Sequence, residues 1–315
     1  MANPVTMITG IAGGLARLVG AALVQQGHDV VGVDYRPLGP PLDYPAQTYR
    51  ANYNKTRIED VYRRHRPQCV LHLGRVGNLK ERMGKRFDLN VIGSGKLMDL
   101  ALKYGVRSFV VLSTFHIYGA HPHNHIPIHE DEPLRAGAAF PQIADAIQLD
   151  NLASTWVWRH PEVQVVVLRP CNVVGPTINN AMSRFLRSSV VPVMMGFDPM
   201  VQFIHERDLV AAILKAGSGH TAGVFNVAGR SPFPWSEALN RIPARQIHMP
   251  ATLASAYLRL NRLFSSSFPP YLVNFFKYPC VIADHRFREA FDWEPWVSEA
   301  ESICSTVGRS TPART

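Results

Sequence analysis

Residues 5–34 read VTMITGIAGGLARLVGAALVQQGHDVVGVD and contain a complete strand–helix–strand pattern. The opening VTMITG is a short apolar run that ends in glycine, which is typical of a buried strand. Apolar residues then recur at helical spacing through GGLARLVGAALVQQG, and a second β-rich run, HDVVGVDYRP, closes at proline. The stretch therefore predicts a βαβ unit, the building block of a parallel α/β sheet.

The first turn of this unit has small residues at Gly10, Gly13 and Ala16. Gly10 permits a tight turn, Gly13 lets a pyrophosphate approach the backbone, and Ala16 lets the helix pack closely on the strand. The helix N-terminus then faces the phosphates. Asp34 ends the second strand, where a carboxylate binds the hydroxyls of an adenosine ribose. The pattern predicts a dinucleotide site, and Asp34 favours NAD because it would repel a 2′-phosphate. Arg36 leaves NADP open, since a guanidinium can pair with that phosphate.

The alternation of strand and helix continues along the chain. Further β-rich runs cover 68–76, 108–119 and 163–176, with helical stretches such as 89–105 between them. We therefore expect an α/β fold with a doubly wound parallel sheet of the Rossmann type.

Six short motifs in this order carry a resemblance to a known family. They are TGIAGGLA at 9–16, HLG at 72–74, NVIGS at 90–94, LSTFHIYG at 112–119, LRPCNVVGP at 168–176 and FIHERDLVAAI at 203–213. Together they resemble the extended short-chain dehydrogenase/reductases, and among them the NAD-dependent epimerase/dehydratase branch that includes UDP-glucose 4-epimerase.

The resemblance implies a domain plan and a class of activity. It divides the chain into an NAD(P)-binding domain over 1–175 and a mainly substrate-binding region over 176–305, from which about 200–228 returns to the sheet. Residues 306–315 are expected to form a flexible tail. The implied activity is hydride exchange between NAD and a hydroxyl-bearing carbon of an anionic substrate such as a nucleotide sugar, in a protein that is a homodimer.

The resemblance also implies a set of cofactor-binding residues. Asn52 stands where the family often has an aspartate beside the adenine, Arg75 replaces a small residue, and Asn90 would brace the active-site helix. The full set is Thr9, Gly10, Ala12, Gly13, Gly14, Leu15, Asp34, Arg36, Asn52, Leu73, Gly74, Arg75, Asn90, Pro170 and Asn172.

The catalytic tyrosine and lysine of the family are missing from their expected places. Thr114 matches the serine or threonine that polarises the substrate oxygen, but the family's spacing puts Gln142 at the tyrosine position and Ala146 at the lysine position. A slip of two residues would give Phe140 and Ala144 instead. No tyrosine occurs from 119 to 256 and no lysine from 104 to 214, and neither glutamine nor alanine can do this acid–base work. We therefore expect an atypical active site.

Three interpretations follow from this gap. Another group supplies the proton, and His116 is the first candidate because histidine has a suitable pKa and lies two residues after Thr114. Alternatively, the protein is a catalytically inactive NAD-binding sensor or scaffold, since function does not follow from fold. The third interpretation is a metal site in HPHNH, residues 121–125, but a loop of solvated histidines is the default explanation and we assign no metal-binding residues.

Composition limits the compartment and the partners. The formal charge of +9 favours anionic partners, but no block of Lys and Arg interleaved with aromatics indicates nucleic acid. The four cysteines have no CxxC spacing, which favours free thiols in a reducing compartment. A strand begins almost at once, without a signal peptide before it, and no apolar run is long enough to span a bilayer. We therefore expect a cytoplasmic protein.

One further segment has a distinct pattern. In the stretch 251–278, Leu253, Tyr257, Leu260 and Phe264 would share one helical face. Packing over the substrate cleft or against another subunit is the expected role, and contact with a membrane surface is a possible alternative.

Overall fold

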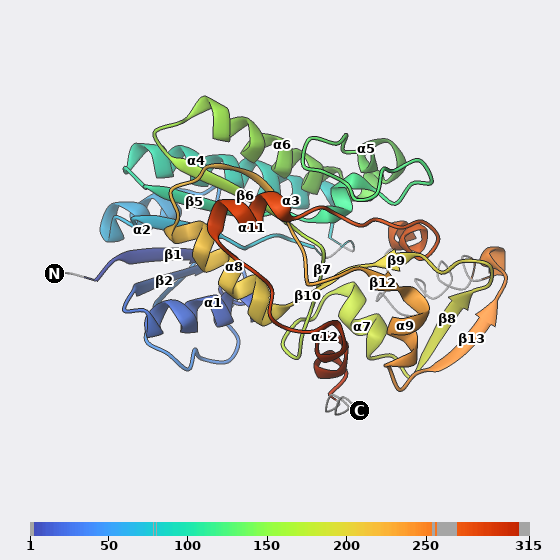
Figure 1. The fold of residues 1–315 in the computed structure, drawn as a ribbon. Helices are drawn as coiled ribbons and strands as arrows, with labels where there is room; N and C mark the ends of the chain where they lie inside the picture. Colours follow the sequence, from blue (N-terminus) through green and yellow to red (C-terminus); the bar gives the residue numbers. More distant parts are fainter. Residues whose placement is uncertain (1–2, 78, 80, 254–255, 257–269, 309–315) are drawn as a thin grey trace.

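A computed structural model gives the fold of the chain and describes residues 3–77, 79, 81–253, 256 and 270–308 (Figure 1). The N-terminal βαβ unit forms where the pattern predicted it. β1 (Val5–Thr9) and β2 (Asp29–Asp34) pair in parallel, and α1 (Gly14–Gln25) connects them. The buried residues of α1 recur at helical spacing, so one apolar stripe faces the sheet.

Seven parallel strands form the central sheet, in the order β11-β6-β5-β4-β1-β2-β3. The further strands are β3 (Gln47–Arg50), β4 (Cys69–His72), β5 (Ser108–Leu112), β6 (Gln164–Pro170) and β11 (Gly223–Val227). The strand order reverses between β1 and β4, which is the place where doubly wound sheets bind ligands. The expected Rossmann-type parallel sheet is confirmed.

Helices cover both faces of this sheet (Figure 1). One face carries α2 (Thr56–His65), α4 (Gly93–Lys103) and α6 (Ala144–Arg159), which pack on Met7, Val70 and Phe109. The other face carries α1, α8 (Glu206–Ser218) and α11 (His285–Phe291), which pack on Ile8, Leu71 and Val110. Neighbouring strand residues thus enter opposite cores, and the apolar strands are buried on both sides.

A smaller region lies beside the carboxyl ends of the strands (Figure 1). Its apolar core joins residues of many short elements. These are β7 (Asn172–Val174), α7 (Ala181–Leu186), β8 (Val190–Met194), β9 (Met200–Val201), β10 (Phe203–His205), β12 (Phe233–Pro234), α9 (Trp235–Asn240), β13 (Arg245–Met249), η4 (Pro270–Phe276) and α12 (Glu299–Thr306). β11 is a strand of the large sheet, and α8 packs on one face of that sheet. Part of 200–228 therefore lies with the N-terminal strands.

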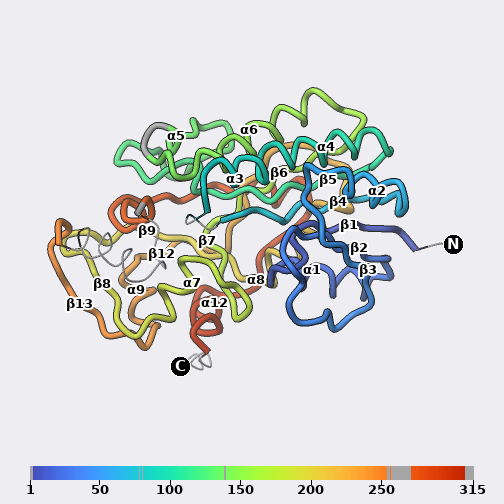
Figure 2. Tube along the Cα trace, turned by 180° about the vertical axis from the view of Figure 1, so that it is seen from behind, coloured from blue at the N-terminus to red at the C-terminus, as the bar shows by residue number. Residues whose placement is uncertain are grey.

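Short helical segments complete the part of the fold that positions the site. They are α3 (Met83–Phe87), the π-helical turn η1 (Asp88–Ile92), η2 (Phe115–Tyr118), α5 (Ala136–Ala139) and η3 (Pro141–Ile143). Figures 1 and 2 both show η4 close to the green segment that contains α5. Aromatic contacts of η4 with Phe115, His116 and Phe140 agree with this placement.

Two predictions fall partly outside the described residues. Of the expected amphipathic face, Tyr257, Leu260 and Phe264 lie outside, and Leu253 is described and exposed. Of the expected flexible tail, 309–315 lies outside, whereas α12 continues to Thr306. Within the described ranges, no helix combines the length and apolar character needed to cross a membrane.

Candidate active site

The glycine turn after β1 is held by backbone contacts. Gly10 has φ +78°, and its N–H donates to the carbonyl of Val33 at 2.8 Å. A Cβ on Gly10 would lie 2.5 Å from Cα of Gly74, so the turns after β1 and β4 approach as closely as two glycines allow. On Gly14 a Cβ would lie 2.7 Å from the carbonyl oxygen of Thr177. A side chain at Gly10 or Gly14 would therefore collide with neighbouring backbone atoms.

The start of α1 suits an anionic group. Its N-cap residue, Gly13, makes no side-chain cap, and the first turn contains no acidic residue. Backbone N–H groups at a helix start and the helix dipole attract phosphate. Together with the close glycine approach, this free helix start fits the pyrophosphate of a dinucleotide.

Asp34, at the carboxyl end of β2, is only 2% exposed and is held on three sides. It accepts hydrogen bonds from the Ala12 N–H at 3.1 Å and from the Arg36 N–H at 2.9 Å. The Arg36 guanidinium, which is half exposed, forms an ion pair with the same carboxylate at 3.1 Å. The two residues that bear on the choice between NAD and NADP therefore contact each other.

Seven of the expected cofactor residues line one of two hollows. Leu73, Arg75, Pro170 and Asn172 line one cavity, whereas Ala12, Gly14 and Arg36 line a second hollow beside the turn at 37–40. Asn52 lines neither, and its side chain is exposed. Its neighbour Tyr53, which the sequence analysis missed, is buried, and a Cβ on Gly74 would lie 2.3 Å from its hydroxyl.

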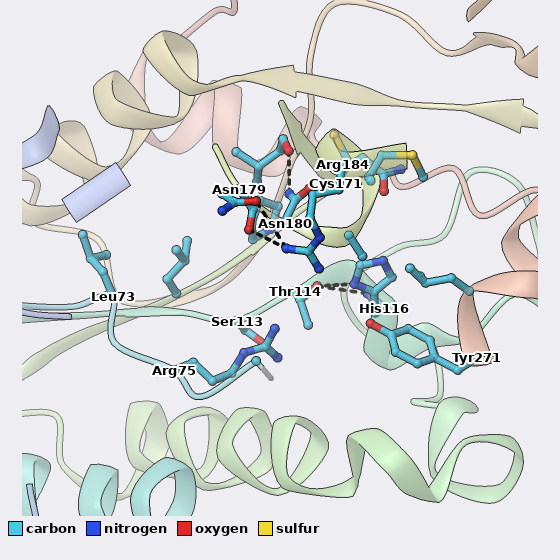
Figure 3. Close-up of a pocket in the computed structure, with 18 residues that line it drawn as sticks. Leu73, Arg75, Ser113, Thr114, His116, Cys171, Asn179, Asn180, Arg184 and Tyr271 are labelled. Carbon is cyan, nitrogen blue, oxygen red and sulfur yellow. Dashed lines mark hydrogen bonds between the residues drawn. The ribbon is translucent and has the colours of Figure 1, made fainter. Parts of the chain in front are cut away.

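The larger cavity has a volume of about 740 Å³ and lies at the carboxyl ends of the central strands (Figure 3). Its walls come from the segments after β4, β5 and β6, from α7 and the turn before it, and from η4. The lining residues are Leu73, Arg75, Gly77, Leu112, Ser113, Thr114, His116, Pro170, Cys171, Asn172, Val173, Asn179, Asn180, Ala181, Met182, Arg184, Tyr271 and Leu272.

Thr114 and His116 form a local pair on the wall after β5. Thr114 caps the short helix η2, and its Oγ1 lies 2.9 Å from His116 Nδ1. His116 Nε2 is buried and has no hydrogen-bond partner in the described part of the chain. Burial, and then the charge of Arg75, lower the pKa of His116 to about 3. The imidazole is therefore neutral at ordinary pH, and the role of His116 as the proton donor stays a prediction.

Tyr271 brings a phenol to this cavity from η4. Its ring meets that of His116 edge-on, with 5.5 Å between the centroids, and the Phe140 ring is tilted against it at 6.1 Å. Figure 3 shows the hydroxyl pointing toward Thr114 and His116. The stretch 251–278 was expected to pack over the substrate cleft or against another subunit, but Tyr271 was not singled out, because the local pattern of 270–276 does not show which side chain enters a cavity.

The positions expected for the tyrosine and lysine lie beside a buried ion pair. Gln142 is exposed in η3, just before α6, and Ala146 is 3% exposed in an apolar cluster. Arg86, from α3, donates to the backbone carbonyl of Gln142 at 2.7 Å and forms a buried ion pair with Asp145. Asn90 donates to the same carboxylate at 2.6 Å, so it contacts α6, the helix it was expected to brace.

A second buried network stiffens the strand ends behind Thr114. Ser113 donates to Asp150 at 2.5 Å, and Arg169 binds the same carboxylate through two nitrogens, at 3.0 and 2.6 Å. Because Ser113, Asp150 and Arg169 are buried and hydrogen-bonded to one another, they fix β5 and β6 to α6. The wall that carries Thr114 therefore has a rigid support.

The histidine loop after η2 does not gather into one cluster. His121 and His123 lie 5.3 Å apart by ring centroids, His125 contacts Glu132 at 3.0 Å, and His129 faces His285. Across the residues that the structure describes, no group of three or more His, Cys, Asp and Glu side chains is arranged to hold a metal ion.

Comparison with known proteins relates this architecture to a family. A family model described as NAD dependent epimerase/dehydratase matches residues 6–228. An uncharacterized protein of Mycobacterium tuberculosis (strain ATCC 25618 / H37Rv) is 27% identical over 279 residues, covering 82% of this chain and 73% of the relative.

Two solved structures share the fold over nearly the whole chain. MoeE5 in complex with UDP-glucuronic acid and NAD has a TM-score of 0.76 at 19% identity, covering 96% of this chain and 97% of that one. UDP-glucose-4-epimerase from Stenotrophomonas maltophila, with bound NAD and formylated UDP-arabinopyranose, has a TM-score of 0.78 at 17% identity, covering 98% and 97%. The resemblance that the six motifs carry is confirmed, and the chain belongs to the NAD dependent epimerase/dehydratase family.

Proposed function

We propose that the chain is an NAD-dependent oxidoreductase of the epimerase/dehydratase type that acts on a nucleotide sugar. The observation that carries the proposal is the cavity at the strand ends. Thr114, Leu73 and Asn172 all line this cavity. Leu73 directly precedes Gly74, whose backbone closely approaches that of Gly10. Ligands of doubly wound sheets bind at this switch point.

The chain's own residues suit NAD at one end of the site. The uncapped start of α1 would bind the pyrophosphate, and Asp34 would bind the adenosine ribose once Arg36 makes room for it. NAD, when bound, supplies reversible hydride transfer at a carbon that carries oxygen. MoeE5 and the Stenotrophomonas enzyme, which share this fold, were both solved with NAD and a UDP-sugar.

The same cavity suits an anionic sugar nucleotide. Arg75 and Arg184 line it, as do the amides of Asn179 and Asn180. Cationic and amide side chains are the usual partners of a diphosphate and of sugar hydroxyls. Thr114 would hold the reacting hydroxyl, and neutral His116 would fix the orientation of Thr114 through the 2.9 Å contact.

Calorimetry followed by a turnover assay tests the proposal. Purified protein freed of nucleotide is titrated with NAD, NADH, NADP and NADPH, and then incubated with NAD and either UDP-glucose or UDP-glucuronic acid while NMR follows the sugar protons. We expect NAD binding, formation of an altered sugar, and a loss of about a hundredfold in kcat for Thr114→Val with recovery in Thr114→Ser.

Two other results would contradict this function. Tight NAD binding without turnover of any nucleotide sugar would favour the catalytically inactive sensor or scaffold. Absence of dinucleotide binding in a folded sample would reject both. A homodimer and a cytoplasmic location are predictions of the same proposal, and sedimentation of the purified protein measures the first.

A further inference from the structure

The hydroxyl of Tyr271 faces the cavity across from Thr114 (Figure 3). The ring is clamped by aromatic neighbours: His116 and Phe275 meet it edge-on, and Phe140 is tilted against it. Within the described part of the chain, its hydroxyl makes no hydrogen bond. A phenol whose ring has aromatic contacts, and whose hydroxyl has no partner among the described residues, is thus directed at the site of the proposed chemistry.

A cation shares the cavity with this phenol and acts on it electrostatically. Arg75 lines the same cavity, and within the described residues it forms no ion pair. Burial raises the pKa of Tyr271 to about 12, while the charges of Arg75 and Arg86 lower it and that of Asp145 raises it. Arg86 is already paired with Asp145, so Arg75 is the cation free to stabilise a phenolate.

The other proton-bearing groups of the cavity are poorer donors. His116 is neutral, because burial and Arg75 hold its pKa at about 3. The Cys171 thiol is 2% exposed and packs in the apolar core between the sheet and α1 and α8. Gln142, at the expected tyrosine position, has an exposed side chain and no acidic proton.

We propose that Tyr271 is the catalytic proton donor and acceptor of this protein, with Arg75 as its counter-cation, supplied from η4 and from the turn after β4. The proposal rests on the proposed function. It assigns the acid–base work of the missing dyad to a phenol and a guanidinium from two other parts of the chain.

The step balances for a keto-sugar nucleotide. The carbonyl carbon gains a hydride with its electron pair from the reduced dinucleotide of the proposed function, and the C=O π bond breaks toward oxygen. That oxygen takes the proton from Tyr271 Oη, which leaves a phenolate in the cavity that Arg75 lines and an alcohol on the sugar. In the opposite direction the phenolate takes the proton of the sugar hydroxyl as the carbon loses its hydride.

Tyr271→Phe tests the assignment, because it removes only the hydroxyl. With UDP-glucose or UDP-glucuronic acid and NAD, we expect kcat to fall by about a hundredfold or more. The Kd of the nucleotide sugar, measured by calorimetry, should change by less than about tenfold, since one hydrogen bond is lost. Tyr278→Phe is the matched control, because Tyr278 lies outside the cavity lining and packs on Phe197. Its kcat should equal that of the unchanged protein.

A second measurement does not depend on turnover. A difluorotyrosine at position 271, whose phenol is more acidic than that of tyrosine, is titrated by its fluorine NMR signal in the Arg75 protein and in Arg75→Gln. We expect its pKa to rise by about one unit in Arg75→Gln. In the turnover assay, Arg75→Lys should retain most of the activity that Arg75→Gln loses.

The outcomes separate this assignment from the proposed function. If the unchanged protein turns over substrate and Tyr271→Phe matches it, Tyr271 is not the donor and the proposed function stands. If the protein binds NAD but turns over nothing, the proposed function fails. The titration then decides alone: a pKa that does not respond to Arg75→Gln overturns the pairing of phenol and guanidinium.

Discussion

Tyr271 meets His116 edge-on, with 5.5 Å between the ring centroids and an interplanar angle of 82°. His116 follows β5 in the nucleotide-binding half of the fold, whereas Tyr271 belongs to a short helix near the C-terminal part of the chain. Both residues line the cavity, so the site is built jointly by the large sheet and by the smaller region.

Gly10→Ala should destabilise the protein by about 3 kcal/mol. The φ of +78° strains any residue with a Cβ, and that Cβ would lie 2.5 Å from Gly74. Gly39→Ala is the control, because Gly39 has φ +74° but no atom within 4 Å of an added Cβ. It should cost about 1 kcal/mol. Urea unfolding measures both, and equal losses would mean that the close approach of Gly10 to Gly74 has no energetic weight.

Asp34→Ala should shift the cofactor preference from NAD toward NADP by about tenfold or more. The substitution removes the carboxylate that would bind the ribose and frees the guanidinium of Arg36 for a 2′-phosphate. Calorimetry with both cofactors measures the ratio. Asp29→Ala changes an exposed carboxylate at the start of β2 and should leave the ratio unchanged. An unchanged ratio in Asp34→Ala would remove Asp34 from cofactor selection.

Asp145→Leu should destabilise the protein by about 3–5 kcal/mol, because it leaves the buried guanidinium of Arg86 without its counter-charge. The double variant Arg86→Met with Asp145→Leu should recover most of this loss, since it removes both charges. Asp60→Ala breaks an exposed pair with Arg63 and should cost less than about 1 kcal/mol. Denaturant unfolding compares the three, and a double variant as unstable as Asp145→Leu would argue against the charge explanation.

Stability should fall as the pH is lowered from 7 toward 5. Burial lowers the pKa of His116 to about 3 and that of His72 to about 4, below the ordinary 6.5. The unfolded chain therefore binds more protons in this range, and the stabilisation present above pH 6.5 is lost as the pH falls toward the folded pKa. The loss is about 1.4 kcal/mol per histidine at pH 5.5.

His116→Gln should remove one histidine's share of that pH dependence. Unfolding free energies at pH 7 and pH 5.5 give the difference, and His123→Gln, in the exposed part of the loop after η2, should not change it. A pH dependence that is the same in His116→Gln and in the unchanged protein would mean that His116 is protonated as readily in the folded state as in the unfolded chain.

The N-terminal half of the site follows from local sequence. The βαβ pattern, the glycine turn and Asp34 lie within thirty residues, and each has a role that backbone geometry dictates. Parallel strands joined by helices bring their carboxyl ends to one edge, so Thr114 and Asn172 could be expected at one site from strand order alone.

Only the tertiary structure brought Tyr271, Arg75 and Arg86 together around the cavity and α6. The gap at Gln142 and Ala146 was visible in the sequence, but the groups near it come from η4, from the turn after β4 and from α3. Short-range periodicity reports which face of an element is apolar. It carries no information on which distant element packs against that face, because the packing depends on the shape and volume of the whole core.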